Sequence, residues 1–360
     1  MSVAACRKTR AENPADRQMG IQQQEGTVDM SVEIKTNTVD PIRQTYGNLQ
    51  RRFGDKPASR YQEASYDIEA VTNFHYRPLW DPQHELHDPT RTAIRMTDWH
   101  KVTDPRQFYY GAYVQTRARM QEATEHAYGF CEKRELLSRL PAELQAKLLR
   151  CLVPLRHAEL GANMNNSSIA GDSIAATVTQ MHIYQAMDRL GMGQYLSRIG
   201  LLLDGGTGEA LDQAKAYWLD DPIWQGLRRY VEDSFVIRDW FELGLAQNLV
   251  LDGLLQPLMY QRFDQWLTEN GGSDVAMLTE FMRDWYGEST RWVDAMFKTV
   301  LAENDANREQ VQAWLEVWEP RAYEALLPLA EEATGIAALD EVRSAFATRL
   351  QKIGLKSREE

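Results

Sequence analysis

From residue 104 to the C-terminus, apolar residues recur at the spacing of amphipathic helices almost without interruption. Alternation of apolar and polar residues typical of strands is essentially missing, so the pattern predicts an all-α fold. Asp104, Pro105 and Gln107 together are typical of a capped helix start. We expect helices at about 104–132, 141–170, 173–203, 222–269 with a bend or break at Pro257, 273–303, 305–332 and 337–352.

The composition excludes several classes of protein. The chain has 360 residues, 43% of them hydrophobic, which is enough for one large helical domain or two ordinary ones. Its formal net charge is -12 and it has no long basic run, so nucleic acid is not an expected partner. Three cysteines do not make a disulfide framework, and no segment approaches the ~18 consecutive apolar residues of a membrane span. We therefore expect a cytoplasmic protein that binds neither nucleic acid nor membrane.

The first 103 residues differ from the rest of the chain. Residues 1–29 are polar and aperiodic, so we expect a disordered tail. Met30 resembles a second start of translation, as an alternative to Met1. Residues 30–103 combine many aromatic residues with repeated prolines, which favours an extended arm that docks either on the chain's own helices, expected over 104–360, or on a partner subunit. The aromatic residues of this arm that are candidates for a subunit interface are Tyr61, Tyr66, Phe74, Tyr76, Trp80 and Trp99.

The residues around His182 bear on whether the chain can hold a di-iron site. Carboxylate-bridged di-iron sites in helical bundles use Glu-x-x-His pairs, because residues three apart share one helix face and can bind the same iron. His182 lies in a helical stretch that suits such a ligand, but Thr179 precedes it by three residues, and no histidine of the seven follows a glutamate at that spacing. The sequence also lacks a Gly-rich phosphate loop, a Cys-x-x-Cys pair and a flavin or nicotinamide fingerprint. Any electrons must therefore come from another protein.

Four long stretches carry a resemblance to a known family. They are DWHKVTDPRQFYYGAYVQTRARMQ (98–121), RHAELGANMNNSSIAGDSIAATVTQMHIYQAMDRL (156–190), DWFELGLAQNLVLDGLLQPLMY (239–260) and FMRDWYGESTRWVDAM (281–296). From about Met30 onward the chain resembles the β subunit of the hydroxylase component of bacterial multicomponent monooxygenases, in the branch of phenol hydroxylase and toluene monooxygenase. The resemblance implies a ferritin-like helical bundle with a long irregular N-terminal arm and no metal centre.

The same resemblance implies partners and cofactors. The chain would join α and γ subunits in an α2β2γ2 hydroxylase, served by a small regulatory protein and a reductase. The di-iron centre would lie in the α subunit, FAD and an iron–sulfur cluster in the reductase, and no cofactor in this chain. The complex would hydroxylate phenol or a related arene with O2 and NAD(P)H, as a phenol 2-monooxygenase, while this chain is a structural subunit without a catalytic residue. Which arene it prefers is not indicated.

The resemblance also places the lost ligands of the α subunit on this sequence. The vestigial ligand positions are Glu159, Thr179, His182, Glu242 and either Glu280 with Arg283 or Glu288 with Arg291. Arginine keeps its proton in proteins and cannot ligate iron, so these departures agree with a metal-free subunit. We expect Glu159 to pair with Arg283 or Arg291 at the vacated centre, and the alternative is an ordinary solvated polar stripe.

Other readings of the sequence remain open. His84 and His87 have a spacing that suits zinc, but they lack two further ligands and are more often hydrogen-bonded or exposed histidines. The chain would be a stand-alone metal-dependent oxygenase if His182, Glu159, Glu242 and Glu280 were atypical ligands. A helical binding protein without enzymatic role is the third alternative.

Overall fold

Two antiparallel helices joined by a three-residue turn lie at the centre of the fold. These are α5 (Leu155–Asp172) and α6 (Ala176–Leu203), which pack against each other along their length. The computed structural model describes residues 47–69, 77–79 and 81–358, all of which belong to the compact unit Thr36–Glu360. The expected tail 1–29 lies outside the described residues.

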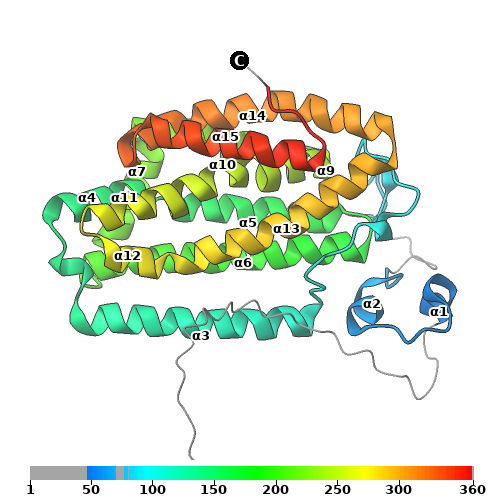
Figure 1. Ribbon diagram of the computed structural model, residues 1–360, viewed down its shortest axis with the longest axis horizontal. Coiled ribbons are helices and arrows are strands. Elements are labelled where there is room, and N and C mark those ends of the chain that lie inside the picture. Colours follow the sequence, from blue (N-terminus) through cyan, green and yellow to red (C-terminus); the bar gives the residue numbers. More distant parts are fainter. Residues whose placement is uncertain (1–46, 70–76, 80, 359–360) are drawn as a thin grey trace, which may run out of the picture. The chain divides into compact units, whose positions relative to one another are not determined.

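The described residues form helices and connecting segments, which confirms the all-α prediction (Figure 1). Before α5 they comprise α1 (Gly47–Phe53), α2 (Arg60–Ser65), η1 (Pro89–Arg91), η2 (Trp99–Lys101), α3 (Tyr110–Arg134), η3 (Leu137–Arg139) and α4 (Ala142–Cys151). After α6 they comprise α7 (Glu209–Asp220), α8 (Pro222–Ser234), α9 (Trp240–Gly244), η4 (Leu245–Leu251), α10 (Asp252–Pro257), η5 (Leu258–Arg262), α11 (Phe263–Glu269), α12 (Ser273–Leu278), α13 (Glu280–Glu303), α14 (Asp305–Ala333) and α15 (Ile336–Ile353). None of them is long and apolar enough to cross a bilayer.

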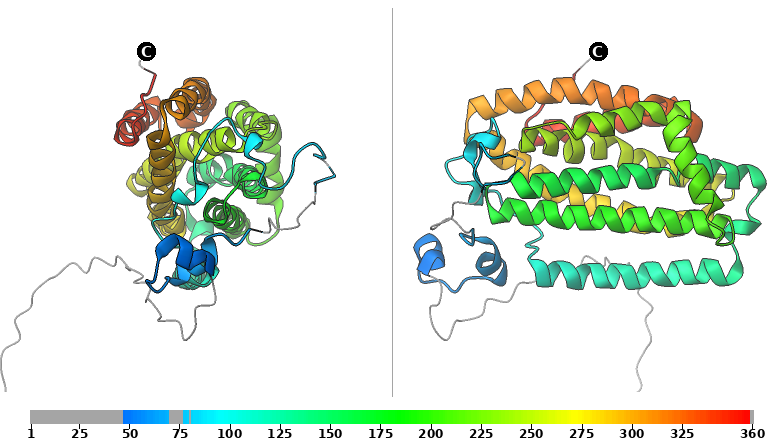
Figure 2. Two further views of the ribbon diagram at one scale, coloured as in Figure 1. Left: turned by 90° about the vertical axis from the view of Figure 1, so that its right-hand side faces the viewer. Right: turned by 180° about the vertical axis from the view of Figure 1, so that it is seen from behind.

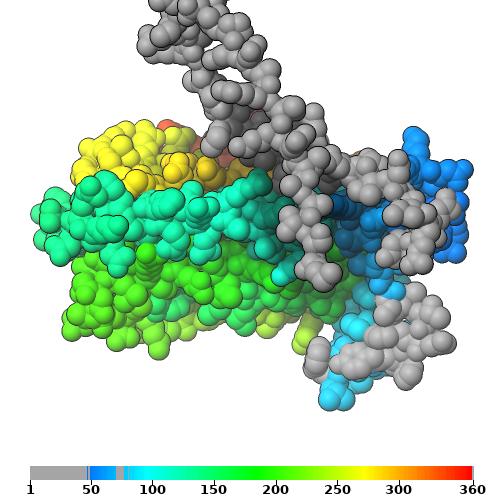
Figure 3. Space-filling view, turned by 90° about the horizontal axis from the view of Figure 1, so that it is seen from below, coloured from blue at the N-terminus to red at the C-terminus, as the bar shows by residue number. Residues whose placement is uncertain are grey.

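Four helical segments surround the interior of the bundle. They are α5, α6, the continuous segment 240–269 that runs from α9 to α11, and α13 (Figure 1). Helix α14 packs against α8 and η4, and α15 packs against α14 and α10. Helix α3 lies outside this set, between α6 and the pair α12–α13 (Figure 3). The arrangement leaves one face of α5 and α6 without a described helix in front of it (Figure 2, right).

Segment 240–269 is not a regular α-helix, because η4 and η5 are π-helical. A π-turn bonds residue i to i+5 and so needs more residues per turn than the 3.6 of an α-helix. In an α-helix of 3.6 residues per turn, side chains four residues apart do not point in quite the same direction, and the difference accumulates along the helix. Turns that contain more residues reduce this accumulated rotation. Asn248, Asp252 and Gln256 therefore all face the interior at intervals of four, and all are 3% exposed or less.

Several expected helix boundaries are wrong, for local reasons. Asp104 does cap a turn, accepting from the Arg106 amide at 2.8 Å, but Gln107 has a positive φ of 52° and the helix begins only at Tyr110. The segment 141–170 is two helices broken at 152–154, and 222–269 is interrupted at 235–239. Pro257 does not split its helix, because the neighbouring π-turns accommodate its missing N–H.

The core is rich in tryptophan. Trp224, Trp285 and Trp292 are fully buried, and Trp240 is 2% exposed. Cys131 and Cys151 are buried free thiols of this core. Helices α8 and α14 meet so closely at Gly226 that a Cβ there would lie 2.8 Å from the Ala325 carbonyl oxygen.

The aromatic residues of the arm divide into two groups. Phe74, Tyr76 and Trp80 lie outside the described residues. Tyr61, Tyr66 and Trp99 are at most 8% exposed, so their rings pack on this chain and offer little area to a partner. The Trp99 ring lies 4.9 Å from Trp240, for example. The sequence left open whether the arm docks on the chain's own helices or on a partner subunit. Tyr61, Tyr66 and Trp99 pack on the chain itself.

Candidate functional site

A buried ion cluster lies at the interior of the four helical segments. Arg189 of α6 donates from Nη1 to Glu159 Oε2 of α5 at 2.7 Å, and its Nη2 pairs with Asp252 Oδ2 of α10. Gln256 Nε2 donates to the other Glu159 oxygen at 3.2 Å, and the Arg189 guanidinium lies 4.4 Å from the ring of Trp285. The Arg189 guanidinium of α6 thus contacts all three of the other segments.

A second polar layer lies two turns away along α5 and α6. Asn166 and Asn248 exchange amide hydrogen bonds of 3.0 and 2.9 Å, and His182 Nδ1 donates to Asn166 Oδ1 at 3.0 Å. Burial lowers the pKa of His182 to about 3, so the imidazole is neutral, with its ring edge-on to Trp292. The interior of the bundle therefore carries two layers of polar groups rather than one.

The electrostatics of the ion cluster follow from burial. Burial raises the pKa of Glu159 and of Asp252, and the nearby Arg189 opposes this rise in both carboxyls. Burial lowers the pKa of Arg189, but the two carboxylates outweigh it and leave that pKa raised. Two carboxylates facing one guanidinium give the cluster a formal charge of -1, and Gln256 and Gln247 stabilise it by donating to Glu159 and Asp252.

The antiparallel pairing of α5 and α6 decides which vestigial positions can meet. Moving seven residues toward the turn on α5, from Glu159 to Asn166, moves the partner seven residues toward the turn on α6, from Arg189 to His182. Glu159 thus faces Arg189, and Thr179 lies nearer the turn, where its hydroxyl lies 2.9 Å from that of Ser173. Glu159, Thr179 and His182 consequently share no common centre.

The expected pairing of Glu159 with Arg283 or Arg291 is wrong, although a guanidinium does bind Glu159. Arg283 lies on α13 with its side chain 40% exposed, and Arg291 is exposed. The alternative of a solvated stripe fails too, because Glu159 is 2% exposed. The sequence signal for the right partner was the spacing itself, since a hairpin that turns at 173–175 places residue 159 opposite residue 189.

The remaining vestigial positions lie away from the ion cluster. Glu242 of α9 accepts from Trp318 Nε1 at 2.9 Å, and Glu280 is exposed. Glu288 of α13 accepts from Arg117 of α3 and from Arg106 in the segment before α3. Arg117 also forms two hydrogen bonds of 2.8 Å with Asp188.

The described residues do not fit a di-iron centre. Such a centre needs four carboxylates and two histidines aimed at two metal ions, whereas here a guanidinium lies between two buried carboxylates, Glu159 and Asp252. A guanidinium offers no lone pair and repels a cation. His182 lies in the other polar layer, beside Asn166 and Asn248. Among the described residues no three His, Cys, Asp or Glu side chains are grouped so as to hold a metal.

The histidines considered for zinc have other partners. His84 Nδ1 lies 2.8 Å from Asp81 Oδ1, and His87 Nδ1 lies 3.3 Å from the carbonyl oxygen of Ser173. Arg91 donates to Asp81 at 2.8 Å and so competes for the same carboxylate. The hydrogen-bonded reading of both histidines fits this geometry.

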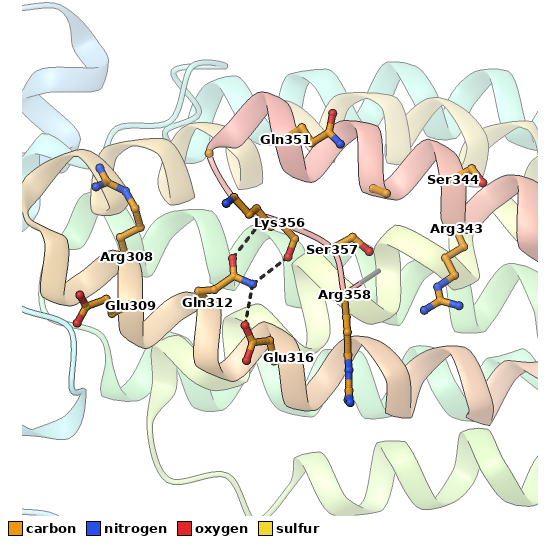
Figure 4. A pocket seen from close by; sticks show the side chains of 12 residues that line it. Arg308, Glu309, Gln312, Glu316, Arg343, Ser344, Gln351, Lys356, Ser357 and Arg358 are labelled. Atoms are coloured by element: carbon orange, nitrogen blue, oxygen red, sulfur yellow. Dashed lines mark hydrogen bonds between the residues drawn. The ribbon is translucent and has the colours of Figure 1, made fainter. Parts of the chain in front are cut away.

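A groove at the C-terminal end has the character of a solvated surface. It encloses about 1260 Å³ between α14, α15 and the segment that follows α15 (Figure 4). Gln312 fastens that segment, donating to the Lys356 carbonyl at 2.9 Å and accepting from the Lys356 amide at 3.1 Å. Charged side chains of both signs line it, including Arg308, Glu309 and Glu316. The mixed charges define no acid–base pair.

The comparisons with known proteins agree with this arrangement. The family model of methane, phenol and alkene hydroxylases matches residues 80–304. The chain belongs to the methane, phenol and alkene hydroxylase family. It is 49% identical over 327 residues to the oxygenase component MhpL of the phenol 2-monooxygenase of Acinetobacter pittii, covering 91% of this chain and 98% of that protein.

Two further relatives of this hydroxylase-family chain cover most of its length. The crystal structure of phenol hydroxylase from Pseudomonas sp. OX1 contains a chain that is 64% identical, with a TM-score of 0.86, covering 91% of this chain and 100% of that one. The β subunit of the toluene-4-monooxygenase hydroxylase of Ectopseudomonas mendocina is 25% identical over 259 residues, covering 70% and 77% of the two chains. The predicted resemblance and the helical bundle are thereby confirmed.

Proposed function

We propose that this chain is the non-catalytic β subunit of a multicomponent aromatic hydroxylase. It would support a larger, homologous α subunit in the hydroxylation of phenol or a related arene. The observation that carries the proposal is the ion cluster of Glu159, Arg189 and Asp252. The guanidinium of Arg189 occupies the interior of the bundle, whereas a catalytic di-iron bundle needs metal ions in its interior.

The cofactors and partners follow from that role. The di-iron centre would belong to the α subunit, where it activates O2. Electrons would pass from NAD(P)H through the FAD and iron–sulfur cluster of a separate reductase, and a small regulatory protein would act on the α2β2γ2 complex. The relatives named as hydroxylase or oxygenase components support such a complex. This chain supplies no proton donor or acceptor to the reaction.

Iron content and subunit retention test the proposal together. The chain is expressed alone, and then with a larger subunit that contains two Glu-x-x-His pairs. We expect iron near zero in the isolated chain and about two iron ions per co-purified pair, the content of one di-iron site. Stoichiometric iron in the isolated chain would instead establish the stand-alone oxygenase, and a chain that retains no larger subunit would establish the binding protein.

A matched variant separates the two subunits' contributions to activity. Glu159→Gln should leave the iron content of the complex and its turnover of phenol at the wild-type level wherever the complex assembles. A single substitution of a ligand in the larger subunit should abolish both. Loss of iron on Glu159→Gln, in a complex of normal subunit composition, would show that this chain takes part in metal binding.

A further inference from the structure

The distribution of charge on α5 and α6 is inverted relative to an ordinary surface helix. Between Ala158 and Gly171 the one charged residue is Glu159, which is 2% exposed. Between Ala176 and Ser197 the charged residues are Asp188 and Arg189, which are 4% and 1% exposed, and His182 is buried as well. Surface helices normally turn charges to water and apolar residues inward.

The outer face of the same two helices carries apolar side chains. Leu160 and Met164 of α5 are 48% and 50% exposed, and Met187 and Leu190 of α6 are 48% and 49% exposed. Because the helices are antiparallel, Leu160 lies opposite Met187, so the four side chains form one patch. The other residues turned outward between them are small or uncharged, such as Ser167, Ser168 and Gln194. We call this uncharged surface of α5 and α6 the hairpin face.

The size of the hairpin face suits a stable interface. At 1.5 Å per residue, the stretches whose outward face is uncharged are about 20 Å long on α5 and about 33 Å on α6, and each helix is about 10 Å wide. The projected area is roughly 500 Å², most of the about 800 Å² that each partner buries in a standard interface. Charged residues appear at its ends, Asp172 on α5 and Arg198 on α6, as in the polar rim of an interface.

We propose that the hairpin face is the surface by which this chain binds the larger catalytic subunit, a partner that presents a matching uncharged pair of helices. The identity of the partner rests on the proposed function. A flat pair of helices packs best on another pair of helices, ridges into grooves. A second copy of this chain fits less well, because self-pairing would bring two bodies of formal charge -12 together without an ion pair across the contact.

Charge introduced at the centre of the face tests the proposal. Met164→Glu and Met187→Glu place a carboxylate on an exposed position, so each isolated variant should fold with a wild-type melting temperature. We expect each to retain the larger subunit more than about tenfold less well than the wild type, since a buried unpaired charge is strongly unfavourable. Val317→Glu on α14, equally exposed at 51%, is the control and should bind normally. Normal retention by both methionine variants would overturn the proposal.

Thiol labelling in the assembled complex does not depend on those variants. Met187→Cys and Val317→Cys are made in a Cys6→Ser background, where Cys131 and Cys151 are buried. A maleimide should label Met187→Cys readily in the isolated chain and more than about tenfold more slowly in the complex, whereas Val317→Cys should react equally in both. Equal labelling of Met187→Cys would overturn the proposal.

Protection of Met187→Cys already in the isolated chain would also overturn it. A dimeric isolated chain would then identify a second copy as the occupant, and a monomeric one would identify the chain's own first 46 residues. A wild-type chain that binds no larger subunit would contradict the proposed function itself, and with it the partner assigned to the face.

Discussion

Arg189 Nη1 lies 2.7 Å from Glu159 Oε2, and both side chains are 2% exposed. Replacing Arg189 by methionine leaves Glu159 and Asp252 buried without their cation. We expect the free energy of unfolding, measured with urea, to fall by about 3–5 kcal/mol. Arg291→Met, on the exposed face of α13, is the control and should change it by less than about 0.5 kcal/mol. Equal stability of the two variants would contradict this account.

Neutralising the carboxyls should recover part of that loss. The variant Arg189→Met, Glu159→Gln, Asp252→Asn carries no buried charge, and the desolvation of an ion cluster offsets much of its Coulombic attraction. We expect this triple variant to be more stable than Arg189→Met alone. If it is less stable, the methionine's shape rather than the uncompensated charge is responsible.

Asp264 gives the stability a distinct pH dependence. Burial raises its pKa to about 7, while the Thr279 hydroxyl that donates to it opposes the rise. In the unfolded chain this carboxyl titrates near 4. The contribution of the group is therefore full below about pH 4 and is lost as the pH rises through about 7. Relative to Asp264→Asn, the wild type should lose on the order of a few kcal/mol between pH 4 and 8.

Melting temperatures of the two proteins across that pH range measure the difference. Asp284→Asn, at an exposed position of α13, should run parallel to the wild type at every pH. A constant difference between the wild type and Asp264→Asn from pH 4 to 8 would show that Asp264 does not change protonation on unfolding.

Close packing at Gly226 predicts a sensitive backbone contact. A methyl group there would lie 2.8 Å from the Ala325 carbonyl oxygen and 3.0 Å from its Cα, so α14 would have to shift. We expect Gly226→Ala to lower the free energy of unfolding by about 1–3 kcal/mol. Gly129→Ala, in α3, meets nothing within 4 Å and should raise it by up to about 1 kcal/mol. Effects of the same sign in chemical unfolding would refute the packing argument.

The segment after α15 should contribute to stability through one buried carboxylate. Glu319 is 0% exposed and accepts from the Ser357 hydroxyl and, at 3.2 Å, from the Arg358 amide. Deleting residues 355–360 removes these donors and the buried Leu355 side chain. We expect a loss of at least about 2 kcal/mol. Deleting residues 359–360 alone should leave the melting temperature unchanged.

Much of the fold could be predicted because helical periodicity is a local property of the sequence. The end of α6 at Leu203 and the start of α8 at Pro222 follow from glycine and proline signals. The start of α3 could not, because Asp104 and Gln107 form a turn that depends on contacts with Tyr61 and Arg106. The π-turns of 240–269 leave no signal in a pattern that assumes 3.6 residues per turn.

The sequence predicted that an arginine pairs with Glu159, but it did not predict which arginine. Glu159 does bind a guanidinium, and the residue type that excludes metal was foreseen as arginine. The partner is Arg189 because the register of the α5–α6 hairpin, not similarity to ligand motifs, sets which side chains meet. Asp252 was missed because its burial depends on the π-turn before it. The domain boundaries at 29 and 103 stay a prediction.

The positive charge at the centre of this bundle belongs to a side chain, that of Arg189, and not to a bound metal ion. A bundle held by metal folds only as fast as the ion is supplied, and its stability depends on the free concentration of that ion. Arg189 removes this dependence, since the guanidinium is present at the moment of synthesis. In a cell short of iron this bundle would still reach its folded form, because the positive charge at its centre comes from a side chain of the same polypeptide.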